Sequence, residues 1–225
     1  MPGAGVNVAR VIDARAERLV QVVEAVAATI FAGGVAIFPT DTVYGIGCDP
    51  YDAGALARIY GAKRRPRNKP LSLHVATVAE FVEYARDNAR AVHAARRLMP
   101  GPVTIIVRRP AFIPEDVTAG LATLGFRVPD DPVCRAILER CGPLAATSAN
   151  PSGESAYLGA GDWQTLPPAD LLVENGPTRW QAESTIIDVS GPQTVLLREG
   201  VLSVDRIVER IGPVVTHPAK FRSNV

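Results

Sequence analysis

The sequence predicts a mixed α/β fold in which a twisted sheet is flanked by helices. Segments whose apolar residues recur every three or four positions alternate along the chain with short apolar runs that predict buried strands. Three of these runs, at 171–175, 184–190 and 194–200, follow one another closely, so we expect part of the sheet to be antiparallel. The composition, with 47% hydrophobic and 21% charged residues, is typical of a globular protein with a sizeable core.

Each element is placed by its periodicity and by the residues that end it. The first helix is predicted at 17–32, where Val22, Val26 and Ile30 recur at helical spacing and a Gly-Gly pair ends the pattern. Further helices are predicted at 53–63, 77–86, 88–98, 132–142 and 203–212. Strands are predicted at 35–38, 71–75, 103–109, 125–129 and 143–147, in addition to the three late runs. Residues 39–47 contain a proline and two glycines and are predicted to form a loop.

We predict a single domain over residues 1–225, with its core at about 17–212 and a polar tail at 213–225. No run of about 18 apolar residues predicts a membrane span, and the charges near the N-terminus are unlike a secretory signal. The three cysteines lack metal-ligand spacing and predict reduced thiols, so we expect a cytoplasmic protein without a metal site of its own. Because the net charge is only +1, any function of basic residues must be local.

Polar motifs follow several predicted strands, at the place where α/β folds usually bind ligands. The most charged of them, KRRPRNKP at 63–70, carries five positive charges within seven residues. Taken alone, this basic loop would indicate a solvated turn or a patch that contacts RNA. No motif has the spacing of a phosphate-binding loop, a dinucleotide fingerprint or a serine hydrolase elbow. The function must therefore be sought in the combination of motifs.

Two charged side chains in these motifs raise a question of pairing. Asp41 lies in PTDTVYG, where we expect it to hydrogen-bond to the backbone of its own turn. Arg127 lies on a predicted strand, where a buried and unpaired cation would be costly. Its partner would be either the carboxylate of a ligand or an acidic residue of the chain.

Seven motifs occur together in the order and approximate spacing of one family. They are FPTDTVYGIGCD, KRRPRNKPLSLHV, GPVTIIV, FRVP, TSANPSG, STIIDVS and LLREG. Over about residues 17–212 the chain resembles the YrdC/Sua5 family, the threonylcarbamoyl-AMP synthases. The resemblance implies a YrdC-like fold with a concave positive surface. It also implies that L-threonine, bicarbonate and ATP, accompanied by Mg²⁺, are condensed to threonylcarbamoyl-AMP and pyrophosphate. Partner proteins would then transfer the threonylcarbamoyl group to tRNA in t6A synthesis.

The same resemblance assigns the site residues. It implies catalytic roles for Lys63 and Arg65, the K-x-R pair of the basic loop, at the phosphates or the carbamate. The threonine-binding residues would be Thr42, His74, Arg127, Thr147 and Ser184. The ATP-binding residues would be Lys63, Arg65, Lys69, Thr123, Ser148, Asn150 and Arg198. After SANPSG the chain departs from the family pattern, and no ATP contact is assigned to residues 154–163.

Two alternatives to the synthase are carried forward. One is a non-catalytic module of the same fold that binds double-stranded or ribosomal RNA through a basic concavity and needs only the charges; Arg64 and Arg67 are expected to face solvent or tRNA. The other is a carbamoyl-transfer relative that uses an acceptor different from threonine. The hydroxyl and amide groups of Thr42, Ser148 and Asn150 favour the synthase, because an RNA-binding module would not need them.

Overall fold

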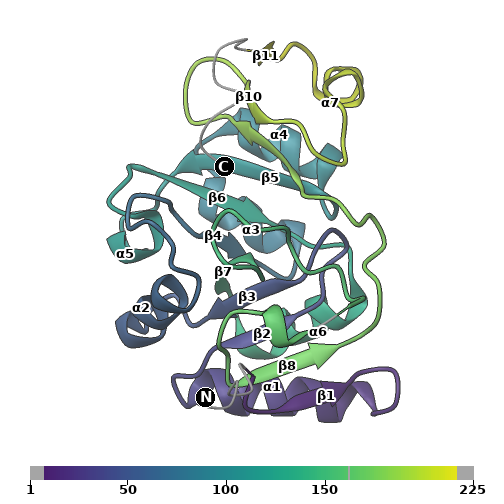
Figure 1. Cartoon of the computed structure of the whole chain (residues 1–225). Coiled ribbons are helices and arrows are strands. Elements are labelled where there is room, and N and C mark those ends of the chain that lie inside the picture. Colours follow the sequence, from purple (N-terminus) through teal and green to yellow (C-terminus); the bar gives the residue numbers. More distant parts are fainter. Residues whose placement is uncertain (1–7, 162, 217–225) are drawn as a thin grey trace.

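The computed structural model describes residues 8–161 and 163–216, whose strands form one eleven-stranded sheet (Figure 1). The strands are β1 (Val11–Asp13), β2 (Ala36–Phe38), β3 (Gly45–Cys48), β4 (Ser72–His74), β5 (Val103–Arg108), β6 (Thr123–Arg127), β7 (Leu144–Ser148), β8 (Leu171–Glu174), β9 (Thr185–Asp188), β10 (Val195–Arg198) and β11 (Val215–Thr216). Their order across the sheet is β1-β8-β2-β3-β7-β4-β6-β5-β9-β10-β11. The sheet contains both parallel pairs, such as β4 with β6, and antiparallel pairs, such as β3 with β7, which confirms the predicted mixed sheet.

Side-chain caps set the start of most helices. The helices are α1 (Leu19–Phe31), α2 (Ala53–Ala62), α3 (Val78–Ala85), α4 (Ala89–Leu98), α5 (Glu115–Thr118), α6 (Pro132–Cys141) and α7 (Val204–Ile211), with a short 3₁₀ turn η1 (Trp163–Thr165). In five of them the residue before the helix accepts a hydrogen bond from a backbone N–H of the first turn, which satisfies a group that has no partner inside the helix. These caps are Asp52, Thr77, Asn88, Asp131 and Ser203.

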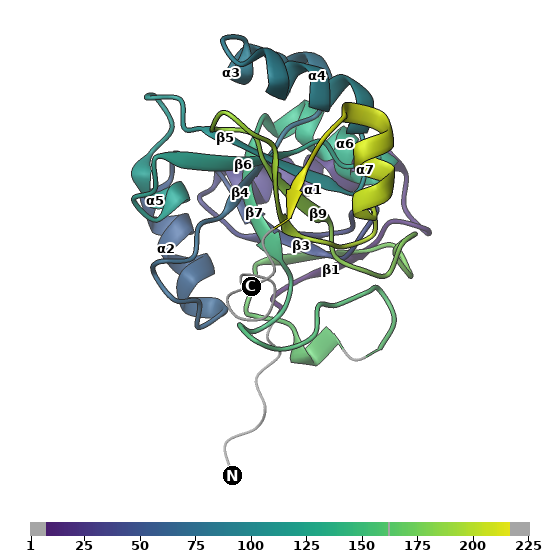
Figure 2. The ribbon, with the colours of Figure 1, turned by 90° about the horizontal axis from the view of Figure 1, so that it is seen from above.

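Two apolar clusters lie on opposite faces of the sheet. On one face, α1 and α6 pack together, and Val26 and Ile137 join Phe38 of β2. On the other face, α2, α3 and α4 contribute to a larger cluster, in which the rings of Phe81 and Phe126 lie 5.5 Å apart. Figure 2 shows α3 and α4 side by side on the outside of the sheet. Full burial of one such side chain contributes about 1.5–3 kcal/mol, so both faces hold the sheet in place.

Part of the α1–α6 face is polar rather than apolar. The strand register places Ser72 beside both Gly125 and Ala146, and places His74 beside Arg127. Because paired residues point to the same side of a sheet, all five lie on the face that α1 and α6 cover elsewhere. Ser72 and Gly125 are partly exposed. This side of β4 and β6 can therefore meet a ligand.

Residues 39–47 differ from the prediction, because Gly45–Cys48 form strand β3 and not a loop. A Cβ at Gly47 would lie 3.1 Å from both the ring of Phe38 and the carbonyl oxygen of Ala145. The glycine therefore permits close packing of an aromatic ring within a strand, and its presence does not mark a turn here.

Short elements account for the other differences. The sequence did not predict β1, α5 or β11, which have only two to four residues and show no periodicity. Strands β9 and β10 pair antiparallel, as expected, but β8 lies between β1 and β2, far from both. None of the helices in the described part of the chain is long and apolar enough to cross a membrane.

Candidate active site

Lys63 joins the basic loop to the loop that follows β7. It lies at the end of α2 and is 1% exposed. Its Nζ atom donates hydrogen bonds to the carbonyl oxygens of Ser148 and Asn150, and to Oδ1 of Asn150 at 3.3 Å. In return, the backbone N–H of Ser152 donates to the carbonyl oxygen of Lys63 at 2.8 Å. Three residues assigned to ATP, Lys63, Ser148 and Asn150, are thus brought together.

The ammonium of Lys63 has no carboxylate as a hydrogen-bond partner. The pKa of Lys63 is lowered to about 7, mainly by burial and also by the positive charge of Arg65, while the negative charge of Glu183 acts in the opposite direction. The oxygen atoms that bind the ammonium are all neutral carbonyl or amide oxygens. The protonated form is therefore disfavoured in this buried place, and near neutral pH Lys63 lies close to the midpoint of its titration.

The rest of the basic loop divides into inner and outer residues. Arg65 is partly buried and donates from Nε to the carbonyl oxygen of Lys69 at 3.1 Å and from Nη2 to that of Pro70 at 2.8 Å. Burial lowers the pKa of Arg65. Arg64 and Arg67 are exposed, and the guanidinium of Arg67 lies over a tyrosine ring. The loop thus folds its own backbone around Arg65 and leaves the other two arginines at the surface.

Arg127 forms a buried ion pair with Asp41. Its Nη2 atom lies 2.5 Å from Oδ1 of Asp41, and the two side chains are 6% and 0% exposed. The same Oδ1 accepts a hydrogen bond from the backbone N–H of Asp130 at 3.1 Å, and the carbonyl oxygen of Asp41 accepts one from Trp180 at 2.9 Å. The expectation that Asp41 binds only the backbone of its own turn is therefore wrong. The chain itself supplies the acidic partner that Arg127 requires.

His74 lies next to this ion pair and is uncharged. The register pairs it with Arg127, and it is 5% exposed. Burial and the neighbouring charge of Arg127 lower its pKa to about 3, so the imidazole is neutral at physiological pH. Its Nδ1 atom is buried without a hydrogen-bond partner. A contact between His74 and threonine stays a prediction.

The two threonines beside Asp41 are buried in the same loop. The Oγ1 atoms of Thr40 and Thr42 are 3.1 Å apart, and Thr40 also donates to the carbonyl oxygen of Val43. Thr178 holds the loop from the other side, because its hydroxyl donates to the carbonyl oxygen of Thr42 at 2.7 Å. The loop after β2 is thus fixed at Thr42 as well as at Asp41.

Ser184 and Arg198 form a second polar group with Thr104. The hydroxyl groups of Thr104 and Ser184 are 3.0 Å apart. Arg198 donates to the carbonyl oxygen and to Oγ of Ser184, at 3.0 and 3.2 Å, and to Glu183 at 2.6 Å. Burial lowers the pKa of Arg198. Arg198 was assigned to ATP, yet its direct partner is the serine that was assigned to threonine.

Two assigned residues lie apart from these groups. Thr147 pairs with Ile46, whereas Ser148 pairs with Gly45, and successive residues of a strand point to opposite faces. Thr147 therefore faces away from the side on which Ser148 lies, and its assignment to threonine stays a prediction. Thr123 is half-buried, two residues before Gly125, on the polar face of β6.

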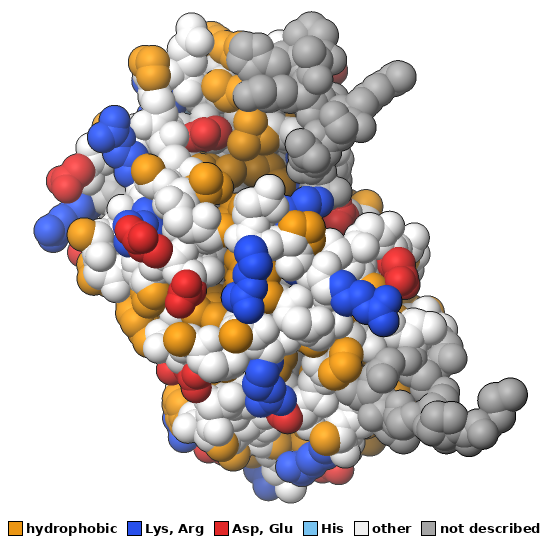
Figure 3. All heavy atoms as spheres, turned by 60° about the vertical axis from the view of Figure 1, so that its left-hand side comes forward, with side chains coloured by type: hydrophobic (Ala, Val, Ile, Leu, Met, Phe, Trp, Pro, Cys, Tyr) orange, Lys and Arg blue, Asp and Glu red, His pale blue; other side chains and the backbone are white. Residues whose placement is uncertain are grey.

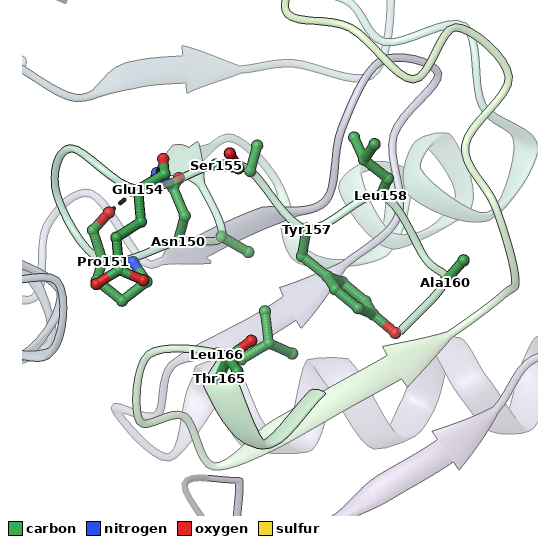
Figure 4. Close-up of a pocket in the computed structure, with 11 residues that line it drawn as sticks. Asn150, Pro151, Glu154, Ser155, Tyr157, Leu158, Ala160, Thr165 and Leu166 are labelled. Carbon is green, nitrogen blue, oxygen red and sulfur yellow. Dashed lines mark hydrogen bonds between the residues drawn. The ribbon is translucent and has the colours of Figure 1, made fainter. Parts of the chain in front are cut away.

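A pocket of about 210 Å³ opens beside Asn150. Asn150 and Glu154 lie at one end of it, Leu158 and Ala160 lie at the other, and Tyr157 lies between them (Figure 4). The amide of Asn150 donates to the carbonyl oxygen of Glu154 at 2.6 Å, and the ring of Tyr157 meets that of Tyr44 edge-on at 4.9 Å. Two residues of the segment that departs from the family pattern are thus placed, Tyr157 beside Tyr44 just before β3 and Glu154 beside Asn150 of the Lys63 group.

The surface charge and the possible metal ligands of the described residues bear on the remaining expectations. On the face shown in Figure 3, Lys and Arg side chains lie singly, with Asp and Glu side chains between them. The concave positive surface implied by the resemblance stays a prediction. Within residues 8–161 and 163–216, no three His, Cys, Asp or Glu side chains are placed to hold a metal ion.

These features define an α/β protein whose sheet presents buried cations and hydroxyl groups at one polar site. A family model described as telomere recombination, for Sua5, YciO and YrdC, matches residues 28–200. The chain therefore belongs to the Sua5/YciO/YrdC family, which confirms the resemblance found in the sequence.

Individual relatives are similar over most of this chain. The threonylcarbamoyl-AMP synthase of Pyrococcus abyssi is 35% identical over 199 residues, which are 86% of this chain and 58% of that protein. The threonylcarbamoyl-AMP synthase of Bos taurus is 31% identical, over 96% of this chain and 82% of the relative. The crystal structure of P. abyssi Sua5 complexed with L-threonine superposes with a TM-score of 0.81 at 31% identity, and covers 97% of this chain and 64% of the other. This chain thus spans less than two thirds of the P. abyssi protein.

Sequence reasoning missed two partners of the assigned residues, Thr104 and Glu183, and misjudged Asp41. The need of Arg127 for an acidic partner was a usable signal for Asp41, because a buried guanidinium is rarely left unpaired. No comparable signal marked Thr104, which lies in an apolar strand and meets Ser184 only through the pairing of β5 with β9.

Proposed function

We propose that this chain is a threonylcarbamoyl-AMP synthase, a nucleotidyltransferase that condenses L-threonine, bicarbonate and ATP to threonylcarbamoyl-AMP and pyrophosphate. The observation that carries the proposal is the pair of buried cations, Lys63 and Arg127, each surrounded by polar groups from different motifs. The names of the relatives from P. abyssi and B. taurus support the same activity.

The reaction requires positioning more than it requires a reactive side chain. The amine of threonine and bicarbonate form a carbamate with loss of water, and a carbamate oxygen then attacks the α-phosphate of ATP while pyrophosphate leaves. No covalent bond to the protein is formed. Holding the reactants in line can contribute roughly 7–11 kcal/mol, and fixed positive charges stabilise the phosphoryl group during transfer.

The Lys63 group forms the nucleotide part of the proposed site. Lys63 fixes the backbone of Ser148 and Asn150, so that the loop after β7 keeps one shape, and adds a positive charge beside it. Arg65 and Lys69 come from the same basic loop and are suited to phosphate oxygens, the first through its planar fork. Magnesium would enter as the ATP complex, held mainly by the phosphates, as is usual for this ion.

The Arg127 group forms the threonine part. Arg127 offers donors for a carboxylate, while Thr42 and Ser184 offer hydroxyl groups for the side chain of the substrate. Arg198 fixes Ser184 through two hydrogen bonds and thereby orders this part of the site as well. We further propose that the product passes to partner proteins of t6A synthesis in the cytoplasm, and that the exposed arginines of the basic loop can contact tRNA.

One assay tests the proposed activity. The protein is incubated with ATP, Mg²⁺, labelled bicarbonate and L-threonine, and the products are separated by chromatography. A labelled adenylate that forms only when all substrates are present is expected. L-valine serves as the control, because it has nearly the shape of threonine but lacks the hydroxyl group that the site would bind. Absence of the adenylate, or equal turnover of valine, would contradict the proposal.

A further inference from the structure

Asp41 is the point at which three loops of the site meet. Its Oδ1 atom accepts hydrogen bonds from Nη2 of Arg127, at the end of β6, and from the backbone N–H of Asp130 in the loop that follows. Its carbonyl oxygen accepts the backbone N–H of Trp180, in the segment between β8 and β9. The loop after β2 is thus tied, at one residue, to the two segments that carry Arg127 and lead to Ser184.

The ion pair of Asp41 with Arg127 is incomplete. Five buried side-chain atoms in the described part of the chain lack a hydrogen-bond partner, and three of them are Oδ2 of Asp41, Nε of Arg127 and Nδ1 of His74. Buried polar atoms are nearly always satisfied in folded proteins, and an arginine that serves only structure usually pairs with a carboxylate through two parallel hydrogen bonds. Nε of Arg127 is a donor that suits a carboxylate, whereas Oδ2 of Asp41 can only accept, so these atoms together indicate a site for a ligand with both acceptors and donors, such as an amino acid.

The single contact leaves part of the guanidinium available. A guanidinium has five N–H donors, and Asp41 engages only the Nη2 end of Arg127. Nη1 makes no hydrogen bond with any described residue. The two donor edges of a guanidinium are Nε with Nη2 and Nη1 with Nη2, so a single hydrogen bond at Nη2 leaves one of these edges for a second carboxylate.

We propose that Asp41 is a positioning residue, which holds the guanidinium of Arg127 in the orientation that receives the carboxylate of the amino-acid substrate. This inference rests on the proposed function, because it takes L-threonine as the ligand. The negative charge of Asp41 also weakens the electrostatic attraction between Arg127 and an anionic ligand. Orientation outweighs this effect, since an arginine without a fixed partner must lose its side-chain freedom when the ligand binds.

Calorimetric titration of L-threonine and of Mg·ATP against the full chain tests the proposal. Asp41→Asn keeps the shape and an accepting oxygen but removes the charge, and is expected to weaken threonine binding about tenfold or more, with ATP affinity within about twofold of the wild type. The matched control is Asp130→Asn, which neutralises a neighbouring acid whose own partner is the exposed Arg179. It is expected to leave threonine affinity unchanged.

The outcomes separate the two proposals. A wild type that binds ATP but not L-threonine would overturn the proposed function, and the inference with it. A wild type that binds L-threonine, together with an Asp41→Asn variant that binds it equally well or more tightly, would overturn the inference alone.

Two further variants distinguish positioning from support of the fold. Arg127→Lys combined with Asp41→Asn is expected to bind threonine within about twofold of Arg127→Lys alone, because Asp41 acts through Arg127. If the losses of threonine affinity caused by the two substitutions add up in the double variant, that role is contradicted. If Asp41→Asn does not fold, Asp41→Glu is used, since it keeps the charge and moves it by one methylene group. We expect this variant to fold, with a somewhat lower unfolding temperature because the site is fully buried, and to bind threonine more weakly; unchanged binding would overturn the inference.

Discussion

Two buried cations, Lys63 and Arg127, are stabilised in different ways within one site. Lys63 is 1% exposed and Arg127 is 5% exposed, so both have lost most of their hydration. The ammonium of Lys63 is surrounded by neutral oxygens of Ser148 and Asn150, whereas the guanidinium of Arg127 meets the carboxylate of Asp41. Lys63 therefore has no hydrogen-bonded counter-charge, and a bound triphosphate would favour its protonated form, while Arg127 is paired with Asp41 and contributes mainly directed donors.

The largest effect is expected from Lys63→Met, which keeps the aliphatic stem and removes the charge. The loop after β7 would lose its anchor and the nucleotide would lose a cation. By analogy with the loss of other donors that stabilise developing charge, we expect synthesis to fall by roughly 10²–10³-fold, or about 2.7–4 kcal/mol. Single-turnover rates at saturating ATP measure this loss. Wild-type rates would show that the charge of Lys63 has no role in the reaction.

A smaller effect is expected from Arg127→Lys, because lysine keeps the charge and can still pair with Asp41. The planar fork is lost, so a carboxylate can no longer be bound through two parallel hydrogen bonds. We expect the KM for threonine to rise about tenfold, which corresponds to about 1.4 kcal/mol, with little change in the KM for ATP. A selective rise in the KM for ATP would place Arg127 in the nucleotide part.

The pH dependence of stability offers a test that needs no substrate. The pKa of Lys63 is lowered from 10.5 to about 7 in the folded protein, mainly by burial. Between these values the folded chain holds fewer protons at this residue than the unfolded chain, so the free energy of unfolding should rise with pH across that range. Denaturant titrations from pH 7 to 10 should show this rise in the wild type relative to Lys63→Met. If the free energy of unfolding depends on pH in the same way in both proteins, the pKa of Lys63 is not lowered by burial.

The smallest effect is expected from Arg64→Ala. Arg64 is exposed and adjoins Lys63 in the basic loop, so this variant is the control for Lys63→Met. Surface substitutions of this kind usually change stability by less than about 0.5 kcal/mol. Synthesis and the unfolding midpoint should both stay near the wild-type values. A loss as large as that of Lys63→Met would mean that the division of the basic loop into inner and outer residues is wrong.

The longer elements could be predicted because their periodicity is strong. The helix predicted at 132–142 is α6 (Pro132–Cys141), and the strand predicted at 103–109 is β5 (Val103–Arg108). Strand β3 could not be predicted, since its glycines serve the packing of Phe38, a contact between strands that sequence spacing does not reveal.

The candidate site shows the same limit. The motifs indicated which residue types gather, and the structure brings Lys63, Ser148 and Asn150 together. The sequence could not predict which residues form hydrogen bonds and ion pairs with one another, because these contacts join residues far apart in the chain. Arg127 and Asp41 are 86 positions apart, and Arg198 reaches Ser184 only because β9 and β10 pair.

The division of the site into a nucleotide part and a threonine part is tested most directly by one crossed set of calorimetric titrations. Mg·ATP and L-threonine are each titrated into Lys63→Met and into Arg127→Lys, with the wild type as reference. We predict that Lys63→Met loses affinity for ATP and keeps its affinity for threonine, and that Arg127→Lys shows the reverse. If each variant loses both ligands to the same extent, the two cations do not serve separate ligands and the account is contradicted.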